Sequence, residues 1–211
     1  MDLSAISADL RERFEAKTAA REGTLVASRR SIRASANAIR AIHRGEFDEA
    51  HRLMDESRAS LDEGRLASRD AHPDIYFAGF LQDAQKEYAE ARLTEAVVTG
   101  AAAPTPDDLG VEMAPYLNGM SEAIGEGRRA ILDLLRRGDV ASGERILAAM
   151  DDIYSLLVTV DYPDAITGNL RRSTDVARGI LEKTRGDLTV SLVQQGLKDA
   201  LEHHARELRA E

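Results

Sequence analysis

The spacing of apolar residues is the feature that most constrains the fold of this 211-residue chain. Through nearly every segment, apolar side chains recur three or four residues apart, which is the pattern of one face of an α-helix. No segment shows the short alternation of β-branched and polar residues that is typical of strands. The sequence therefore predicts an all-α protein.

Helix-breaking residues divide this pattern into seven expected helices. Gly45, Gly100 and Gly138 each follow a periodic segment, and glycine readily ends a helix in a left-handed conformation. The connections between the segments are short, so we expect an antiparallel bundle that forms one domain over residues 1–211. The expected helices cover about 3–43, which a break near Gly23 could divide, then 47–69, 73–100, 109–137, 141–160, 165–184 and 190–208, with a turn at 185–189.

Composition excludes several classes of function. The chain has no cysteine, which rules out disulfides, thiolate zinc sites and cysteine nucleophiles. Its net charge of −9 argues against a broadly basic nucleic-acid binder, although 24 of its 28 basic residues are arginine and could form a local patch. No apolar run approaches the roughly 20 residues of a membrane span, and the start resembles no signal peptide. We expect a cytoplasmic protein without a membrane partner.

One expected helix carries two glutamates a single turn apart. Glu87 and Glu90 lie in the segment 80–93, and Glu87 falls within the apolar stripe of that helix rather than opposite it. A carboxylate on a buried face must be paired or bound to a cation, because burying an uncompensated charge costs several kcal/mol or more. The stripe consists of Phe80, Ala84, Ala91 and Val98.

A second acidic pair lies on the following long helix. Glu122 and Glu126 are four residues apart, with Asp133 seven residues further on, so all three share one stripe. If the two helices pack as antiparallel neighbours, both pairs could converge and hold Mg²⁺ or Mn²⁺ through carboxylate oxygens. Alternatively, each pair is a solvated face with incidental arginine partners. A helix-bundle di-iron site is disfavoured, because it requires Glu-x-x-His motifs that the chain lacks.

The first expected helix carries the opposite charge. Arg29, Arg33, Arg40 and Arg44 follow at steps of four, seven and four residues, which places them on one stripe. Such a row could track a phosphate backbone, or it could pair with acids of a neighbouring helix. The adjacent His43 is interpreted as a partner of the helix dipole at the carboxyl end.

The combined motifs resemble a known family. The segments 21–29, 85–91 and 115–126, together with His43-Arg44 and Gly138-Asp139, resemble the translin/TRAX family in its archaeal single-chain form. The resemblance covers about residues 20–200. It implies a translin-type helical bundle within a closed, barrel-like oligomer, in which translin binds nucleic acid and TRAX cleaves single-stranded RNA with Mg²⁺.

The resemblance also implies roles for the acidic residues. Glu87-Tyr88-Ala89-Glu90-Ala91 matches the TRAX motif Glu-Tyr-x-Glu-Ala, whose acids bind the metal and which translin lacks. Glu122 stands where TRAX has a catalytic aspartate, so its side chain is one methylene longer, and Glu126 matches a glutamate further along. Glu87, Glu90 and Glu122 are therefore the expected catalytic residues, and the same three with Glu126 the expected ligands of Mg²⁺ or Mn²⁺.

Three functions remain open at this point. The leading hypothesis is a TRAX-like, metal-dependent endoribonuclease that cleaves single-stranded RNA and binds it, or single-stranded DNA, through the arginine stripe of the first helix. We expect a homo-oligomer resembling an octameric barrel, because one chain must replace both family partners. The alternatives are a non-catalytic, translin-like scaffold that binds single-stranded nucleic acid, and a helical nucleotide pyrophosphohydrolase with paired glutamate motifs.

Overall fold

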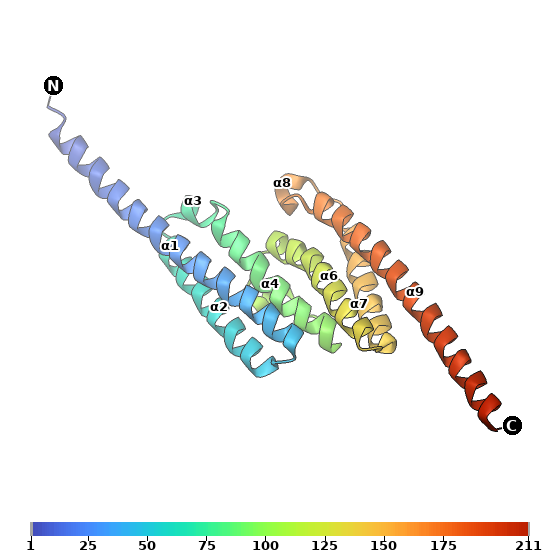
Figure 1. Ribbon diagram of the computed structural model, residues 1–211. Helices are drawn as coiled ribbons and strands as arrows, with labels where there is room; N and C mark the ends of the chain where they lie inside the picture. The colour runs from blue at the N-terminus through green and yellow to red at the C-terminus, as the bar shows by residue number, and fades with distance from the viewer. Residues whose placement is uncertain (1, 211) are drawn as a thin grey trace.

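The computed structural model describes residues 2–210, and within them it is all-α, as the apolar spacing predicts. The long helices lie side by side, from α1 and α2 at one edge to α7 and α9 at the other (Figure 1). Helices α1, α4, α6 and α9 run in one direction, and α2 and α7 run in the opposite direction. Over this range nine helices form: α1 Ser4–Arg44, α2 Phe47–Ser68, α3 Pro73–Tyr76, α4 Phe80–Thr99, α5 Pro106–Leu109, α6 Met113–Arg136, α7 Val140–Thr159, α8 Asp164–Thr167 and α9 Leu170–Ala210.

The difference from seven helices arises because the short helices α3, α5 and α8 precede long ones, while the expected helix 190–208 is continuous with the one before it in α9. The expected helix 73–100 is divided into α3 and α4, because Gly79 adopts a left-handed backbone with φ of 106°. Thr105 caps the short helix α5 by accepting a hydrogen bond from the Asp108 amide. The first helix is continuous through Gly23, so the break left open there does not occur.

The turn expected at residues 185–189 is wrong, because this segment lies within the 41-residue helix α9. Contacts with neighbouring helices hold it in helical form. Arg185 binds both carboxylate oxygens of Asp151 on α7 at 2.6 and 2.7 Å, and Asp187 accepts a hydrogen bond of 2.8 Å from Arg128 on α6. Leu188, only 1% exposed, packs into the core. Tertiary packing thus overrides the weak local preference of Arg-Gly-Asp for a turn.

Helix α4 lies at the centre of the molecule. It packs against α1, α2, α6 and α7, and its residues Leu81, Tyr88 and Leu93 are at most 1% exposed. Because α4 is covered on nearly every side, most of its surface is core, and a single apolar stripe does not describe which of its residues are buried. Its partner α6 contributes Ile124 and Ile131, which are fully buried.

Helices α1 and α2 meet along a seam of small and hydroxyl-bearing residues. The Ser57 Oγ lies 2.8 Å from the Ser31 Oγ and 2.8 Å from the Ser35 Oγ, so the three hydroxyls form a buried chain of hydrogen bonds. One turn further along, Ser60 accepts a hydrogen bond of 2.8 Å from the Arg30 Nε. Small side chains let the two backbones approach closely, and the hydrogen bonds satisfy the hydroxyls that this approach buries.

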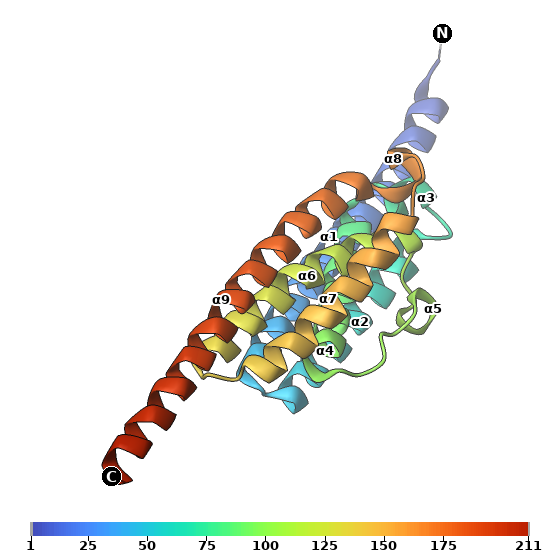
Figure 2. The same ribbon diagram turned by 90° about the vertical axis from the view of Figure 1, so that its right-hand side faces the viewer.

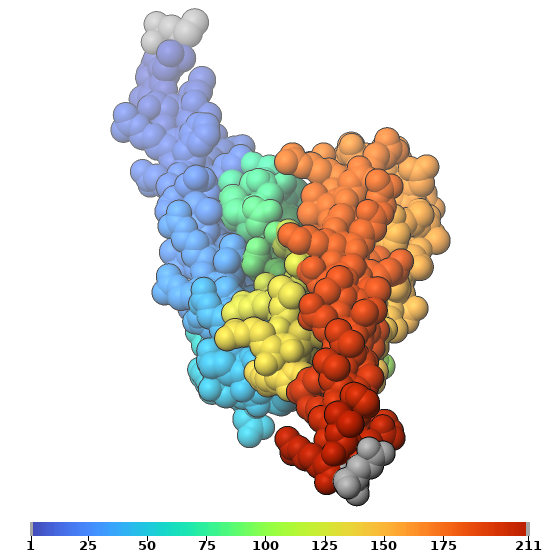
Figure 3. All heavy atoms as spheres, turned by 45° about the vertical axis from the view of Figure 1, so that its right-hand side comes forward, coloured from blue at the N-terminus to red at the C-terminus, as the bar shows by residue number. Residues whose placement is uncertain are grey.

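Both ends of the chain project beyond the bundle, in opposite directions (Figures 1 and 2). Residues 2–16 and 196–209 are exposed throughout, and the space-filling view shows that no other helix covers either projection on the visible face (Figure 3). Apolar side chains nevertheless recur at helical spacing along both. Among the residues described, no helix has the length and apolar character needed to cross a membrane.

Candidate metal centre

The two helices that carry the expected acidic residues pack directly against each other. At their closest approach lies Gly119 of α6, where an added Cβ would be 2.6 Å from the Lys86 carbonyl oxygen and 2.9 Å from the Glu90 amide nitrogen of α4. Only glycine permits this separation. Gly119 therefore sets the distance between the turn that carries Glu87 and Glu90 and the turn that carries Glu122.

Three of the four expected ligands come together at this contact. Glu87, Glu90 and Glu122 each offer a carboxylate oxygen, and the three oxygens lie within 4.8 Å of one another. Glu126 is not part of this group. Oxygen-only ligand sets of this kind suit hard divalent cations such as Mg²⁺ and Mn²⁺.

The burial of the three acids differs from the expectation based on periodicity. Glu90 is the buried member, with 8% of its surface exposed, whereas the Glu87 side chain is 26% exposed and that of Glu122 41% exposed. The placement of Glu87 on a buried stripe is thus corrected. Phe80 and Val98 at the two ends of that stripe are themselves only partly buried, because the side of α4 that bears Glu90 faces the more crowded interior.

The surroundings of Glu90 disfavour its charged form. Burial, together with the negative charges of Glu122, Glu87 and Glu126, raises the pKa of this carboxyl to about 8, against a smaller lowering by Lys86. Its side chain forms no hydrogen bond or ion pair with any other residue of the range 2–210. A buried carboxyl without a protein partner, aimed at two other carboxylates, is the local chemistry expected of a cation ligand.

Lys86 is the residue in this region that the sequence analysis missed. Its Nζ donates to both oxygens of Glu122 at 2.7 Å and lies 3.3 Å from Glu87. Burial lowers the pKa of Lys86, but the hydrogen bond to Glu122 and the charges of Glu122 and Glu87 raise it overall. The ammonium group therefore stays charged at neutral pH. Its position immediately before Glu87 in the sequence could have indicated that it lies near the acidic cluster.

Glu126 binds a different partner. Its Oε2 lies 2.5 Å from the Nε2 of His43 on α1, and Arg129 is 3.7 Å away on the same helix. The hydrogen bond from His43 lowers the pKa of Glu126, against the opposing effect of burial. His43 has a side chain only 5% exposed, so it is a buried contact between α1 and α6 rather than a partner of the helix end. Its spacing of four residues from Ile39 was the signal for burial.

The arginine stripe of α1 is solvent-exposed. Arg29 and Arg33 form no ion pair within residues 2–210, and Arg40 donates to the Asn37 side chain at 2.6 Å. Arg44 forms a salt bridge with Glu46, two residues away. None of the four pairs with an acid of a neighbouring helix in the described structure, so three of the guanidinium groups have no competing carboxylate.

A hollow adjoins the acidic cluster on the side of α9. It has a volume of about 370 Å³, and Glu90 and Glu122 lie on one of its walls while Arg172 and Ser173 of α9 lie on the other. A larger hollow of about 720 Å³ follows the projecting end of α1, far from these acids. Hollow size alone therefore does not locate the site, whereas the convergence of carboxylates does.

Comparison with known proteins places these features in context. No protein-family model matches the chain. An uncharacterized protein of Methanocaldococcus jannaschii is 32% identical over 187 residues, which are 88% of this chain and 82% of that protein.

Solved structures match over nearly their whole length. The chain of AfC3PO in a complex with duplex RNA is 35% identical, with a TM-score of 0.81, and the match covers 89% of this chain and 96% of that one. A crystal structure of AfC3PO matches with the same identity and TM-score over 97% of its chain. Apo-NeC3PO matches with a TM-score of 0.79 at 18% identity, over 90% of this chain and 99% of that one, a likeness of fold alone.

Proposed function

This chain belongs to the translin/TRAX family, to which the matched C3PO structures also belong, and we propose that it is a metal-dependent endoribonuclease acting on single-stranded RNA. The observation that carries the proposal is the convergence of Glu87, Glu90 and Glu122 within 4.8 Å at the contact between α4 and α6. A non-catalytic helical bundle has no need to bury a carboxyl beside two others, because doing so costs stability.

The three carboxylates would hold a Mg²⁺ or Mn²⁺ ion. Glu90 is the ligand with the least access to solvent, and because its pKa is about 8 it would give up a proton when a cation binds at neutral pH. Glu126 would act from outside this group, since His43 holds it at 2.5 Å. A bound divalent ion supplies a positive charge that activates the attacking hydroxyl and stabilises the charge developing on the phosphate.

The RNA would contact basic side chains without acidic partners. Arg29, Arg33 and Arg40 meet this condition on α1, and Arg172 lies across the hollow from Glu90 and Glu122. A guanidinium free of a carboxylate binds a phosphate without first breaking an ion pair. AfC3PO was solved with duplex RNA, so duplex RNA is a further ligand to compare with single strands.

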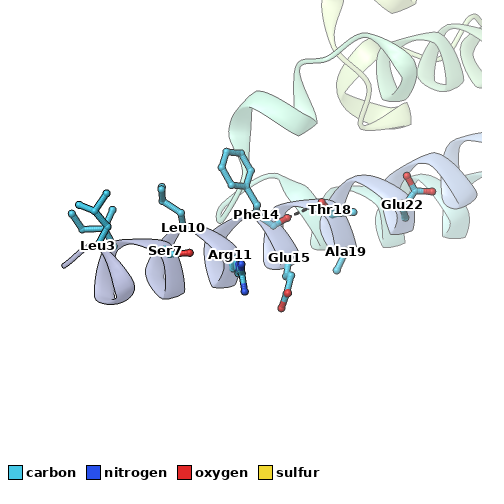
Figure 4. Close-up of a pocket in the computed structure, with 10 residues that line it drawn as sticks. Leu3, Ser7, Leu10, Arg11, Phe14, Glu15, Thr18, Ala19 and Glu22 are labelled. Carbon is cyan, nitrogen blue, oxygen red and sulfur yellow. Dashed lines mark hydrogen bonds between the residues drawn. The ribbon is translucent and has the colours of Figure 1, made fainter. Parts of the chain in front are cut away.

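We also propose that the active form is a homo-oligomer, an octamer-like barrel. Its support is the exposed apolar surface of the two projecting ends. Leu3, Leu10 and Phe14 point to one side of the free end of α1, where nothing in the close-up covers them (Figure 4), and they are 49–64% exposed. Leu197 and Leu201 are 60–61% exposed near the end of α9. Contiguous apolar stripes of this kind mark contacts with other chains.

Cleavage of a labelled single-stranded RNA tests the enzymatic proposal. The wild-type protein should cleave it with Mg²⁺ and not with EDTA, and Glu87→Ala and Glu90→Gln should each lose activity by at least a hundredfold. Glu144→Ala, which removes an exposed acid on α7, is the matched control and should retain full activity. Equal cleavage by all variants, or in EDTA, contradicts the proposal. A labelled duplex assayed in parallel defines the preferred strand form.

One observation favours the alternative of a non-catalytic scaffold that binds single-stranded nucleic acid. Lys86 already compensates Glu122 and Glu87 through contacts of 2.7 and 3.3 Å, which is what a purely structural cluster would show. In that case the protein binds RNA without Mg²⁺, and neither Glu87→Ala nor EDTA changes the affinity. The cleavage assay combined with RNA affinity in EDTA separates the two functions.

A further inference from the structure

Lys86 occupies the acidic cluster in a way that the proposed metal site does not require. The lysine comes from α4 and Glu122 from α6, and the Nζ donates to both carboxylate oxygens of Glu122 at 2.7 Å. It is also 3.3 Å from Glu87. Two of the three converging carboxylates thus contact the single positive charge of Lys86, and the buried Glu90 has no such contact.

Lys86 and a divalent metal ion would compete for the same two oxygens of Glu122. A carboxylate that accepts from an ammonium group through both oxygens has its charge directed to that group, and a divalent ion sharing it would be repelled by the lysine. The Lys86 side chain is 24% exposed, so it has a path away from Glu122. It also lines a separate hollow of about 310 Å³, whose other walls include the exposed Asp83 of α4 and Glu112, which accepts a hydrogen bond from the Tyr76 hydroxyl.

We propose that Lys86 is an exchangeable cation of this site. In the metal-free protein Lys86 neutralises Glu122. When a divalent ion binds, the lysine side chain moves into the 310 Å³ hollow that it lines and there contacts a phosphate of the nucleic acid. This inference rests on the proposed function, because it requires a metal at the acidic cluster. Its consequence is that metal and RNA each strengthen binding of the other, since both draw the lysine to one position.

Metal affinity measured without RNA is the first test, with Mn²⁺ titrated into the full-length protein and followed by electron paramagnetic resonance. Lys86→Met should bind Mn²⁺ at least fivefold more tightly than wild type, because the competing charge is gone. Lys86→Arg keeps the charge and the carboxylate contact, so its affinity should be no higher than that of wild type. Lys183→Met, which removes an exposed lysine of α9, is the matched control and should leave the affinity unchanged.

Coupling to RNA is the second test. A fluorescent single-stranded RNA should bind wild type at least fivefold more tightly when Mn²⁺ is present, and this gain should largely disappear in Lys86→Met but persist in Lys183→Met. Circular dichroism confirms that each variant is folded. The inference is overturned if Lys86→Met leaves the Mn²⁺ affinity unchanged or weaker, or if Lys86→Arg raises it equally. It is also overturned if Mn²⁺ tightens RNA binding in Lys86→Met as much as in wild type.

These measurements separate the inference from the function it depends on. If no variant binds Mn²⁺, the metal site itself is absent and both proposals are wrong. If Mn²⁺ binds and Lys86→Met behaves as wild type, only the role of Lys86 is wrong. If Lys86→Met behaves as expected while the wild type cleaves no RNA, the exchangeable cation stands and the nuclease proposal is wrong.

Discussion

Replacing Gly119 by alanine tests whether the separation of α4 and α6 determines the site. The added methyl would lie 2.6 Å from the Lys86 carbonyl oxygen and 2.9 Å from the Glu90 amide, and ordinary Cβ contacts begin near 3.4 Å. Both contacts are with the α4 backbone, so no side-chain rotation relieves them. The helices would have to separate locally by about 0.8 Å, which is the difference between the ordinary contact and the shorter distance.

Two opposing contributions set the expected magnitude. Overpacking a close helix contact costs typically about 1–3 kcal/mol, and contact with backbone atoms places Gly119→Ala at the upper end. The higher helix propensity of alanine offsets about 1 kcal/mol of this cost, so we expect the free energy of unfolding to fall by about 2 kcal/mol. Because Glu90 and Glu122 move apart, Mn²⁺ affinity should also fall.

Gly179→Ala is the matched control for this change. Gly179 lies on the exposed face of α9, and an added Cβ there meets nothing within 4 Å. Only the helix-propensity gain remains, so this variant should be more stable by about 0.5–1 kcal/mol. Urea unfolding at pH 7 in EDTA, at one protein concentration, measures both. Equal stability of the two variants, or unchanged Mn²⁺ affinity in Gly119→Ala, would show that this spacing does not control the site.

Three further predictions concern charge and assembly. The pKa of Glu90 in the folded protein, about 8, exceeds the ordinary 4.5, so the free energy of unfolding of the metal-free protein should fall as the pH rises from 5 to 8, by up to about 1.4 kcal/mol per pH unit. Urea unfolding across this pH range should show a smaller fall in Glu90→Gln. Arg33→Glu and Arg40→Glu should each weaken RNA binding at low salt about tenfold by fluorescence anisotropy, and unchanged affinity would assign them to the solvated surface. Leu10→Asp with Phe14→Asp should reduce the mass measured by light scattering, and an unchanged mass would exclude this surface from the assembly.

The all-α fold and most helix boundaries were predictable from the sequence because local chemistry decides them. Gly45, Gly100 and Gly138 have φ values of 76–79°, and each lies in the turn that follows a long helix. The continuity of α9 was not predictable in this way. It depends on Arg185 and Asp187 reaching partners on α7 and α6, and these contacts exist only once the bundle has formed.

The candidate site shows the same division between local and tertiary information. The spacing of Glu87 and Glu90 placed both on one turn. The antiparallel packing from which the convergence with Glu122 was expected does not occur. Helices α4 and α6 run parallel, because Gly119 lies against Glu90 and Gly127 against Val97, and the segment through α5 returns the chain to the start of α6. Which acid is buried depends on how many helices surround α4, which a single stripe cannot show. The pairing of Glu126 with His43 likewise joins residues 83 positions apart, beyond the reach of helical periodicity.

The serine seam between α1 and α2 has a consequence for how these helices can move. Ser31 and Ser35 both bond to the single hydroxyl of Ser57, so sliding one helix along the other by one residue would break both bonds and leave three buried hydroxyls unpaired. Each unpaired group would cost about 1–3 kcal/mol, whereas a seam of leucines would offer similar contacts at neighbouring offsets. The seam therefore fixes the axial alignment of α1, and with it the height at which His43 meets Glu126.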